Sequence, residues 1–105
     1  MSDYFENYTS IPTDYTGCCF IASLNEEHYY KNGVAHRTDG PAIRHNIWNG
    51  EYWYFEGQLH RLDGPSETGY QDEKIYHIHG KRFEEVDYWK HPLVVEAKLN
   101  KILSD

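Results

Sequence analysis

The chain has 105 residues, the size of one domain. It carries 17 acidic and 10 basic side chains, for a formal net charge of −7, so it repels a phosphate backbone and direct nucleic-acid binding is not expected. No apolar run resembles a signal peptide, and the longest, 18–22, is far too short to cross a membrane. The adjacent Cys18 and Cys19 form no disulfide framework. We therefore expect a protein that is not membrane-bound and works in a reducing cytoplasm, that of the host cell if the protein is viral.

The first third of the chain predicts an arm followed by a hairpin. Residues 1–16 are polar and aperiodic, which predicts an irregular arm with one edge strand. Residues 17–24 are β-prone and predict the first strand, 25–27 a turn, and 28–31 a second strand. Asn32-Gly33 is typical of a two-residue type I′ turn, because both residues tolerate positive φ.

The middle of the chain predicts further antiparallel hairpins. We expect a strand over 42–48 with Ile43 and Ile47 on one face, then a two-residue turn at Asn49-Gly50. The strongest strand pattern is 51–55. Later turns are predicted at Glu56-Gly57 and His79-Gly80, with a strand over 74–78 between them.

The last part of the chain predicts two helices. Glu84, Glu85 and Asp87 place acidic side chains in the first turn of one helix, and Pro92 suits the first position of a second. In 92–104 an apolar stripe recurs at helical spacing, formed by Val95, Leu99, Ile102 and Leu103. We expect this stripe to cap the open end of the sheet, with docking of a dimer or partner helix as the alternative. The domain would then comprise an arm (1–16), β-hairpin repeats (17–83) and a helical cap (84–104).

One motif occurs twice, at an offset of 24 residues. Its members are His36, Arg37, Asp39, Gly40 and Pro41, and then His60, Arg61, Asp63, Gly64 and Pro65. Upstream, Tyr29-Tyr30 and Gly33 match Trp53-Tyr54 and Gly57, while a third copy around Tyr76, Gly80 and Phe83 lacks the Asp-Gly-Pro. A unit this short buries no core alone, so the copies must stack. The predicted fold is β-rich (α+β): stacked antiparallel β-hairpin repeats forming a curled sheet, with one or two C-terminal helices capping it.

These repeats resemble MORN-type repeats, over about 28–83. The His-Arg-x-Asp-Gly-Pro extension resembles the variant seen in small proteins of tailed phages and large DNA viruses. The resemblance implies that each unit is a β-hairpin and that the units stack into an elongated sheet. Proteins with such repeats serve as scaffolds, membrane-proximal adaptors, antitoxin-like binders or uncharacterised viral products.

The duplicated residues favour a structural role over catalysis, because an active site needs one copy whereas a fold module uses every copy. We expect Asp39 and Asp63 to accept local hydrogen bonds and Arg37 and Arg61 to bridge repeats. No catalytic residue, metal or cofactor is predicted. The alternative, a metal enzyme, would use His36, His60, His77 and His79, of which His77 and His79 share a face if both lie on a strand.

Aromatic and acidic side chains are the candidates for partner binding, because exposed Tyr and Trp are effective in protein recognition. The candidates are Tyr30, Trp48, Tyr52, Trp53, Tyr54, Glu84, Glu85 and Asp87. The predicted function is a small acidic module that binds a host or viral protein and covers its surface, for example as a viral inhibitor of a bacterial defence system or as an adaptor. Nucleic-acid mimicry by the acidic patches ranks lower. A self-assembling homo-oligomer, paired through edge strands, is the alternative.

Overall fold

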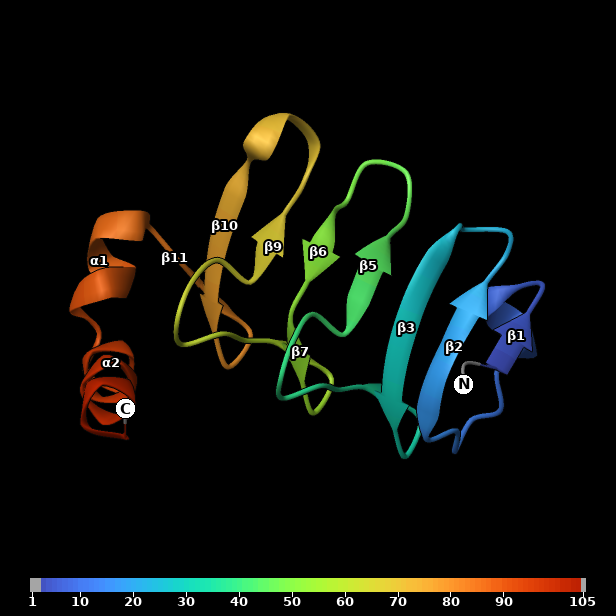
Figure 1. Ribbon diagram of the computed structural model, residues 1–105, viewed down its shortest axis with the longest axis horizontal. Coiled ribbons are helices and arrows are strands. Elements are labelled where there is room, and N and C mark those ends of the chain that lie inside the picture. Colours follow the sequence, from blue (N-terminus) through green and yellow to red (C-terminus); the bar gives the residue numbers. More distant parts are fainter. Residues whose placement is uncertain (1–2, 105) are drawn as a thin grey trace.

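The computed structural model describes residues 3–104, which form a row of short, mostly antiparallel strands ending in two helices (Figure 1). The main sheet is open and has nine strands in the order β1-β2-β3-β5-β6-β9-β10-β11, with β4 also paired to β3. β7 and β8 form a separate hairpin. The strands are β1 (Asp3–Phe5), β2 (Gly17–Ile21), β3 (Glu26–Lys31), β4 (Val34–Ala35), β5 (Ile43–His45), β6 (Glu51–Tyr52), β7 (Tyr54–Phe55), β8 (Gln58–Leu59), β9 (Glu67–Thr68), β10 (Lys74–Ile78) and β11 (Lys81–Phe83). The β-rich fold expected from the sequence is confirmed.

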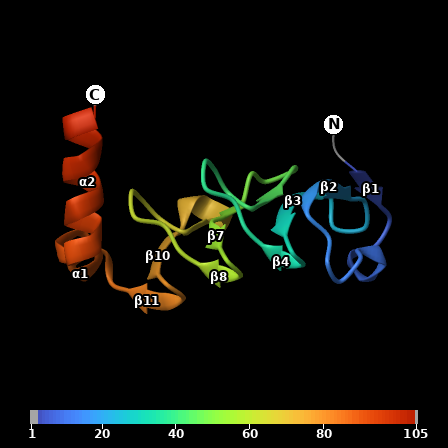
Figure 2. The ribbon, with the colours of Figure 1, turned by 90° about the horizontal axis from the view of Figure 1, so that it is seen from below.

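Three two-residue turns repeat the same backbone geometry. Asn32-Gly33 has φ angles of 49° and 83°, Glu56-Gly57 has 49° and 83°, and His79-Gly80 has 47° and 82°. Positive φ at both positions is the requirement of a type I′ turn, so these three predictions are confirmed. The hairpin segments that these turns close, β4, β7–β8 and β11, lie along one side of the molecule, as Figure 2 shows.

The predicted strand 51–55 is wrong as a single element, because it is divided at Trp53. Residues before Trp53 pair in the main sheet, and residues after it pair in the β7–β8 hairpin. The backbone N–H of Trp53 donates to the carbonyl of Ser66 (2.7 Å), while its carbonyl accepts from the N–H of His60 (2.9 Å). Trp53 is thus the point where the chain exchanges one set of strand partners for another.

The predictions for the first turn and for residues 42–50 are also wrong. The first turn lies at 22–25 rather than 25–27, because β3 begins at Glu26. The strand expected over 42–48 ends at His45, whose N–H donates to the carbonyl of Gly50 (2.8 Å) across a four-residue loop, 46–49. The two-residue turn predicted at Asn49-Gly50 is therefore also wrong, because Gly50 does not have the positive φ that such a turn requires. Ile47 lies in that loop and is 73% exposed, so it does not share a buried face with Ile43.

The arm has the edge strand expected of it: β1 pairs in parallel with β2, so that Asp3 lies opposite Cys19. A short 3₁₀ turn follows at Tyr8–Ser10.

A small core closes the C-terminal end of the sheet. Tyr76 and Ile78 of β10 are buried against Tyr88 and Val94 from the helices. The rings of Tyr76 and Tyr88 lie 4.7 Å apart between centroids. Aromatic side chains supply much of this core because each buries a large apolar area.

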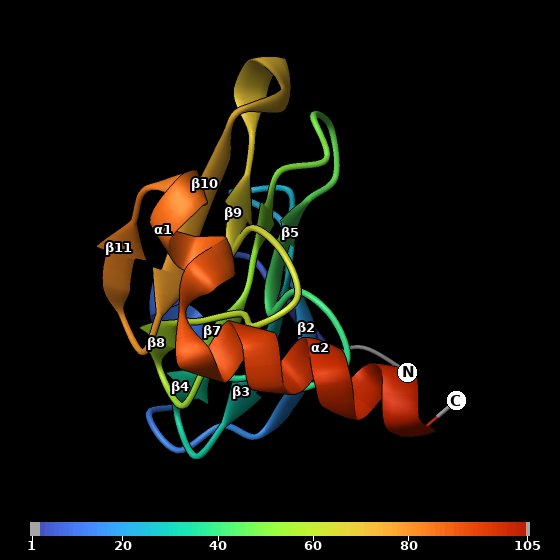
Figure 3. The ribbon, with the colours of Figure 1, turned by 90° about the vertical axis from the view of Figure 1, so that its left-hand side faces the viewer.

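The helices begin where the sequence predicts, but the predicted apolar stripe is not the capping face. α1 spans Glu85–Lys90 and α2 spans Pro92–Ser104. Tyr88 and Val94 are the helical side chains that are fully buried, whereas Val95, Leu99, Ile102 and Leu103 are exposed. The reason is geometric: α2 packs mainly on α1 at the end of the row of strands, so its outer side meets solvent (Figure 3).

Candidate functional site

Each His-Arg-x-Asp-Gly-Pro motif closes a loop around its own arginine. In the first, Nε of Arg37 donates to Oδ1 of Asp39 (2.8 Å) and Nη1 donates to the carbonyl of Pro41 (3.2 Å). The guanidinium lies 4.1 Å from the centroid of the Tyr29 ring, a cation–π contact. A Cβ at Gly40 would come within 2.8 Å of the guanidinium carbon, which explains why glycine stands there. The hydrogen bond from Arg37 lowers the pKa of the Asp39 carboxyl.

The second motif repeats this arrangement. Arg61 donates to Asp63 (2.7 Å) and to the carbonyl of Pro65 (3.1 Å), and its guanidinium lies 3.8 Å from the Trp53 ring centroid. A Cβ at Gly64 would come within 3.0 Å of the guanidinium carbon. The arginine side chains therefore stay within their own loops instead of bridging repeats as expected.

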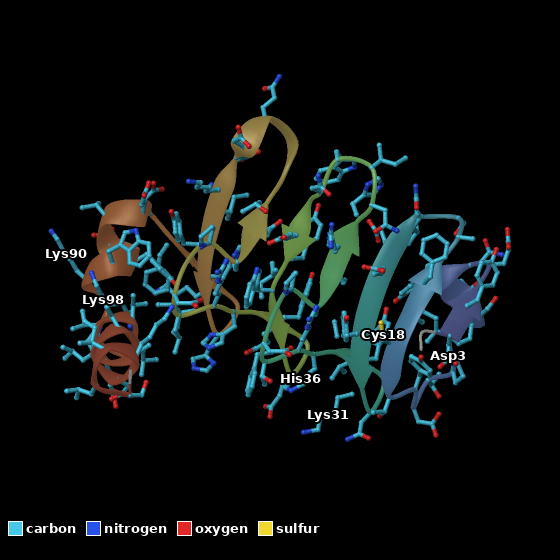
Figure 4. The ribbon with its side chains drawn as sticks, in the orientation of Figure 1. Asp3, Cys18, Lys31, His36, Lys90 and Lys98 are labelled. Atoms are coloured by element: carbon cyan, nitrogen blue, oxygen red, sulfur yellow. The ribbon has the colours of Figure 1, made fainter. Side chains whose placement is uncertain are left out.

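The histidine side chains add contacts between neighbouring repeats to the backbone hydrogen bonds that join them. Nδ1 of His36 accepts the backbone N–H of Glu56 (2.9 Å), and Nδ1 of His60 accepts that of His79 (2.8 Å). Rings also contact one another along this line. The Phe55 ring is tilted against those of His36 and His60, with centroids 4.8 Å and 5.9 Å away, and the ring of His60 stacks on that of His79, with centroids 4.2 Å apart. Figure 4 shows His36 beside the β7–β8 hairpin. These contacts support a structural role for the motif.

The four histidines do not assemble as a metal site would require. His77 is buried with Nδ1 2.7 Å from Oγ of Ser66, whereas His79 is exposed in a turn, so the two do not share a strand face. Within residues 3–104, no three His, Cys, Asp or Glu side chains are placed to hold a metal ion together.

Acid is expected to destabilise the fold through these histidines. Burial lowers the pKa of both His60 and His77 from the ordinary value of 6.5. The unfolded chain therefore takes up protons first, and the free energy of unfolding falls as pH drops below about 6.5. Thermal unfolding from about pH 7.5 to about pH 5.5 should show a falling Tm, with a shallower fall in His60→Asn. A Tm that stays constant or rises in this range would contradict the assignment.

A shallow pocket, here called the Trp48 trough, lies across β6, β9 and the two adjoining loops. One part has a volume of about 220 Å³ and is lined by Trp48, Tyr52, Glu67, Thr68, Gly69, Glu73 and Ile75. The adjacent part, about 450 Å³, shares Trp48, Thr68 and Gly69 and adds Asn49, Asp72 and Lys74. Trp48 lines both parts.

The loop and its neighbours hold Trp48 in place. Its ring stacks on His45, with centroids 4.8 Å apart and planes inclined by 27°. A Cβ at Gly50 would come within 2.0 Å of the ring and one at Gly69 within 3.4 Å, so both glycines give the indole room. The side chain nevertheless stays 39% exposed. The trough thus presents a positioned indole to solvent.

The trough is acidic. Tyr52 lies opposite Glu67 in the β6–β9 pair, and burial together with the Glu67 carboxylate raises the pKa of Tyr52. Glu73 and Asp72 add two exposed carboxylates, against the single lysine, Lys74. An indole beside carboxylates is chemically suited to a cationic side chain, which gains both a cation–π contact and Coulomb attraction.

The other predicted binding residues do not join this trough. Tyr30 is half-buried, with its hydroxyl 2.8 Å from Nδ1 of His28, and Trp53 lies under Arg61. Tyr54 is half-buried in β7. Glu84, Glu85 and Asp87 are exposed at the start of α1, at the end of the molecule.

Sequence reasoning missed Glu67 and Glu73. The repeat offset was the available signal for Glu67, because it occupies the position of Ile43 one repeat later. At this repeat position each residue pairs with the strand that follows it: Ile43 lies opposite Tyr52, and Glu67 lies opposite Ile75.

Comparisons with protein-family models, curated proteins and solved structures find no match to this chain. Over residues 3–104, neither helix has the length and apolar character needed to span a bilayer.

Proposed function

We propose that the protein is a binding module that takes up a basic segment of a partner protein in the Trp48 trough. The observation that carries the proposal is the exposed Trp48 ring, held between His45 and two glycines and flanked by Glu67 and Glu73. A lysine or arginine of the partner would lie over the indole with its charge near these carboxylates.

The character of the trough favours a protein ligand. Its carboxylates repel phosphate, and the chain as a whole carries −7, which also attracts basic surfaces over a distance. The trough is open to solvent and is bordered by the loops 46–49 and 69–73. An extended peptide segment of a partner protein can therefore lie along it. The resemblance to MORN-type repeats, which occur in scaffolds and adaptors, agrees with this proposal.

Such a module acts by occupying its partner's surface, as an inhibitor or as an adaptor. The histidine contacts hold neighbouring hairpins relative to one another, and the stacking on His45 positions Trp48, so the trough is preorganised and little conformational entropy is lost on binding. A viral inhibitor of a host defence protein is one form of this function.

The proposal predicts that a short basic peptide perturbs Trp48. In a ¹H–¹⁵N NMR titration with a blocked Gly-Lys-Arg-Gly peptide, we expect the Trp48 indole and the amides of 48–52 and 67–73 to shift. Trp48→Ala should weaken binding about 3- to 10-fold, the usual value of a cation–π contact.

Tyr4→Ala is the matched control, because Tyr4 is an exposed ring (64%) in the arm and does not line the trough. This variant should bind the peptide like the wild type. Equal weakening by both substitutions, or shifts confined to residues outside the trough, would contradict the proposal.

A further inference from the structure

A cleft, here called the α2 cleft, lies between α2 and the loop that closes around Arg61, at the helical end of the molecule (Figure 2). It has two parts, of about 330 Å³ and about 410 Å³, which are both lined by Leu62, Asp63, Ala97 and Lys101. The cleft shares no lining residue with the Trp48 trough, so a role for it is independent of the function proposed for the trough.

Apolar side chains that the core holds in place line the larger part of the cleft. Leu62 packs against the buried cluster that closes this end of the sheet. The ring of Trp89 meets those of Tyr88 and Tyr76 edge-to-face, with centroids 5.0 Å and 6.0 Å away. Trp89 nevertheless stays 42% exposed, so it offers a positioned apolar surface to a ligand.

Basic side chains outnumber acidic ones in the cleft, although the whole chain has 17 acidic and 10 basic side chains. The charged lining residues are Arg37, Arg61, Lys98 and Lys101, against Asp63. The two arginines are paired with aspartates, whereas no salt bridge joins Lys98 or Lys101 to another residue within 3–104. These lysines lie three positions apart on one side of α2, and they give the cleft uncompensated positive charge.

The arginines also keep hydrogen-bond donors for a ligand. Arg61 uses Nε and Nη1 for Asp63 and the carbonyl of Pro65, and within residues 3–104 its Nη2 has no acceptor and is not buried. The same is true of Nη2 of Arg37. A guanidinium forms directional, charge-assisted hydrogen bonds with the oxygens of carboxylates and phosphates. An anion in the smaller part of the cleft, which both arginines line, can therefore accept such a bond without opening an arginine loop.

We propose that the α2 cleft binds a small amphipathic anion, in which a carboxylate or a phosphate is attached to an apolar group. The charged group lies within reach of Lys101 and Arg61, and the apolar group lies against Leu62 and Trp89. Each part of the cleft falls within the usual volume of a small-molecule site, roughly 300–1,000 Å³. The net charge of −7 favours a small ligand, because the rest of the surface repels a large acidic partner more strongly than an ion inside the cleft.

Titration with four small molecules tests whether the cleft requires both charge and an apolar group. Naphthyl phosphate and naphthoate have both features, whereas naphthol lacks the charge and inorganic phosphate lacks the apolar group. In ¹H–¹⁵N NMR spectra we expect one or both naphthyl anions, below about 5 mM, to shift the amides of 61–63 and 97–102 and the Trp89 indole. The two anions distinguish a phosphate from a carboxylate as the preferred charged group. Naphthol or inorganic phosphate binding as tightly as the better anion, or no shift in the cleft with either anion, would overturn the proposal.

Two double variants with the same change in net charge test the role of the lysines. One carries Lys98→Gln and Lys101→Gln, and the control carries Lys31→Gln and Lys81→Gln at exposed positions outside the cleft. We expect the first to bind the better naphthyl anion about 3- to 10-fold more weakly than the wild type, and the control to stay within about twofold. Circular dichroism verifies that both are folded. Wild-type affinity in the first variant, or equal weakening in both, would overturn the proposal.

Discussion

Gly33→Ala is expected to destabilise the protein far more than Gly57→Ala, although both glycines have φ of +83° in equivalent type I′ turns. A Cβ at Gly57 meets Val34 at 3.4 Å, an ordinary contact, whereas a Cβ at Gly33 would lie 1.9 Å from the carbonyl oxygen of Thr13. The left-handed conformation alone costs alanine about 1–2 kcal/mol, which is the loss expected for Gly57→Ala. Thr13 belongs to the arm, so the methyl group that Gly33→Ala adds would displace the arm. This displacement should raise the loss of unfolding free energy for Gly33→Ala to about 3–5 kcal/mol.

Urea denaturation of the two variants measures this difference directly. The N–H of Gly33 also donates to the carbonyl of Tyr15 (2.9 Å), so the arm should lose hydrogen-exchange protection in Gly33→Ala and keep it in Gly57→Ala. Equal losses of stability in the two variants would show that the arm does not lie against this turn.

Tyr88→Phe is expected to have the next largest effect, about 2–4 kcal/mol. Tyr88 is fully buried, and its hydroxyl lies 2.5 Å from the carbonyl of Arg61 and 2.9 Å from that of Gly64, while accepting the N–H of Gly64 (3.2 Å). Phenylalanine keeps the ring packing on Tyr76 but leaves these backbone groups without a partner. The loop that closes around Arg61, residues 61–65, and the two helices should therefore lose stability together.

Tyr4→Phe provides the comparison, because the hydroxyl of Tyr4 is exposed and its bond to Glu6 (2.9 Å) is on the surface. Its free energy of unfolding should stay within about 0.5 kcal/mol of the wild type. If Tyr88→Phe were as mild as Tyr4→Phe, Tyr88 would not be what anchors the helices.

The parts of the fold that the sequence predicts correctly depend on local signals. Asn32-Gly33 and Glu56-Gly57 form type I′ turns because adjacent residues set the backbone, and Pro92 begins α2 because it lacks an N–H donor. The motif duplication likewise predicts stacked copies. The break at Trp53 depends on partners distant in sequence, Ser66 and His60 at once, which no local pattern contains.

The exposed face of α2 was mispredicted for a related reason. Helical periodicity identifies which residues of α2 share a side, but it does not decide whether that side meets the sheet or solvent. Tyr88 and Val94 fill the end of the core, so the stripe that includes Leu99 is left outside.

The candidate site was predicted in part. Aromatic content identifies Trp48 and Tyr52, which do meet in one trough. It also selects Trp53, which is half-buried beneath Arg61. Glu67 reaches the trough through the β6–β9 pairing and Glu73 from the loop before β10, so composition alone does not connect them to Trp48.

Affinity capture with three purified baits tests the proposed binding function most directly. The baits are the wild type, Trp48→Ala and Tyr4→Ala, each verified to be folded, with bound proteins identified by mass spectrometry. We predict a specific partner that is retained by the wild type and Tyr4→Ala, is lost from Trp48→Ala, and cross-links to the trough through a lysine- or arginine-rich segment. A partner retained equally by all three baits, or one that cross-links outside the trough, would contradict the account.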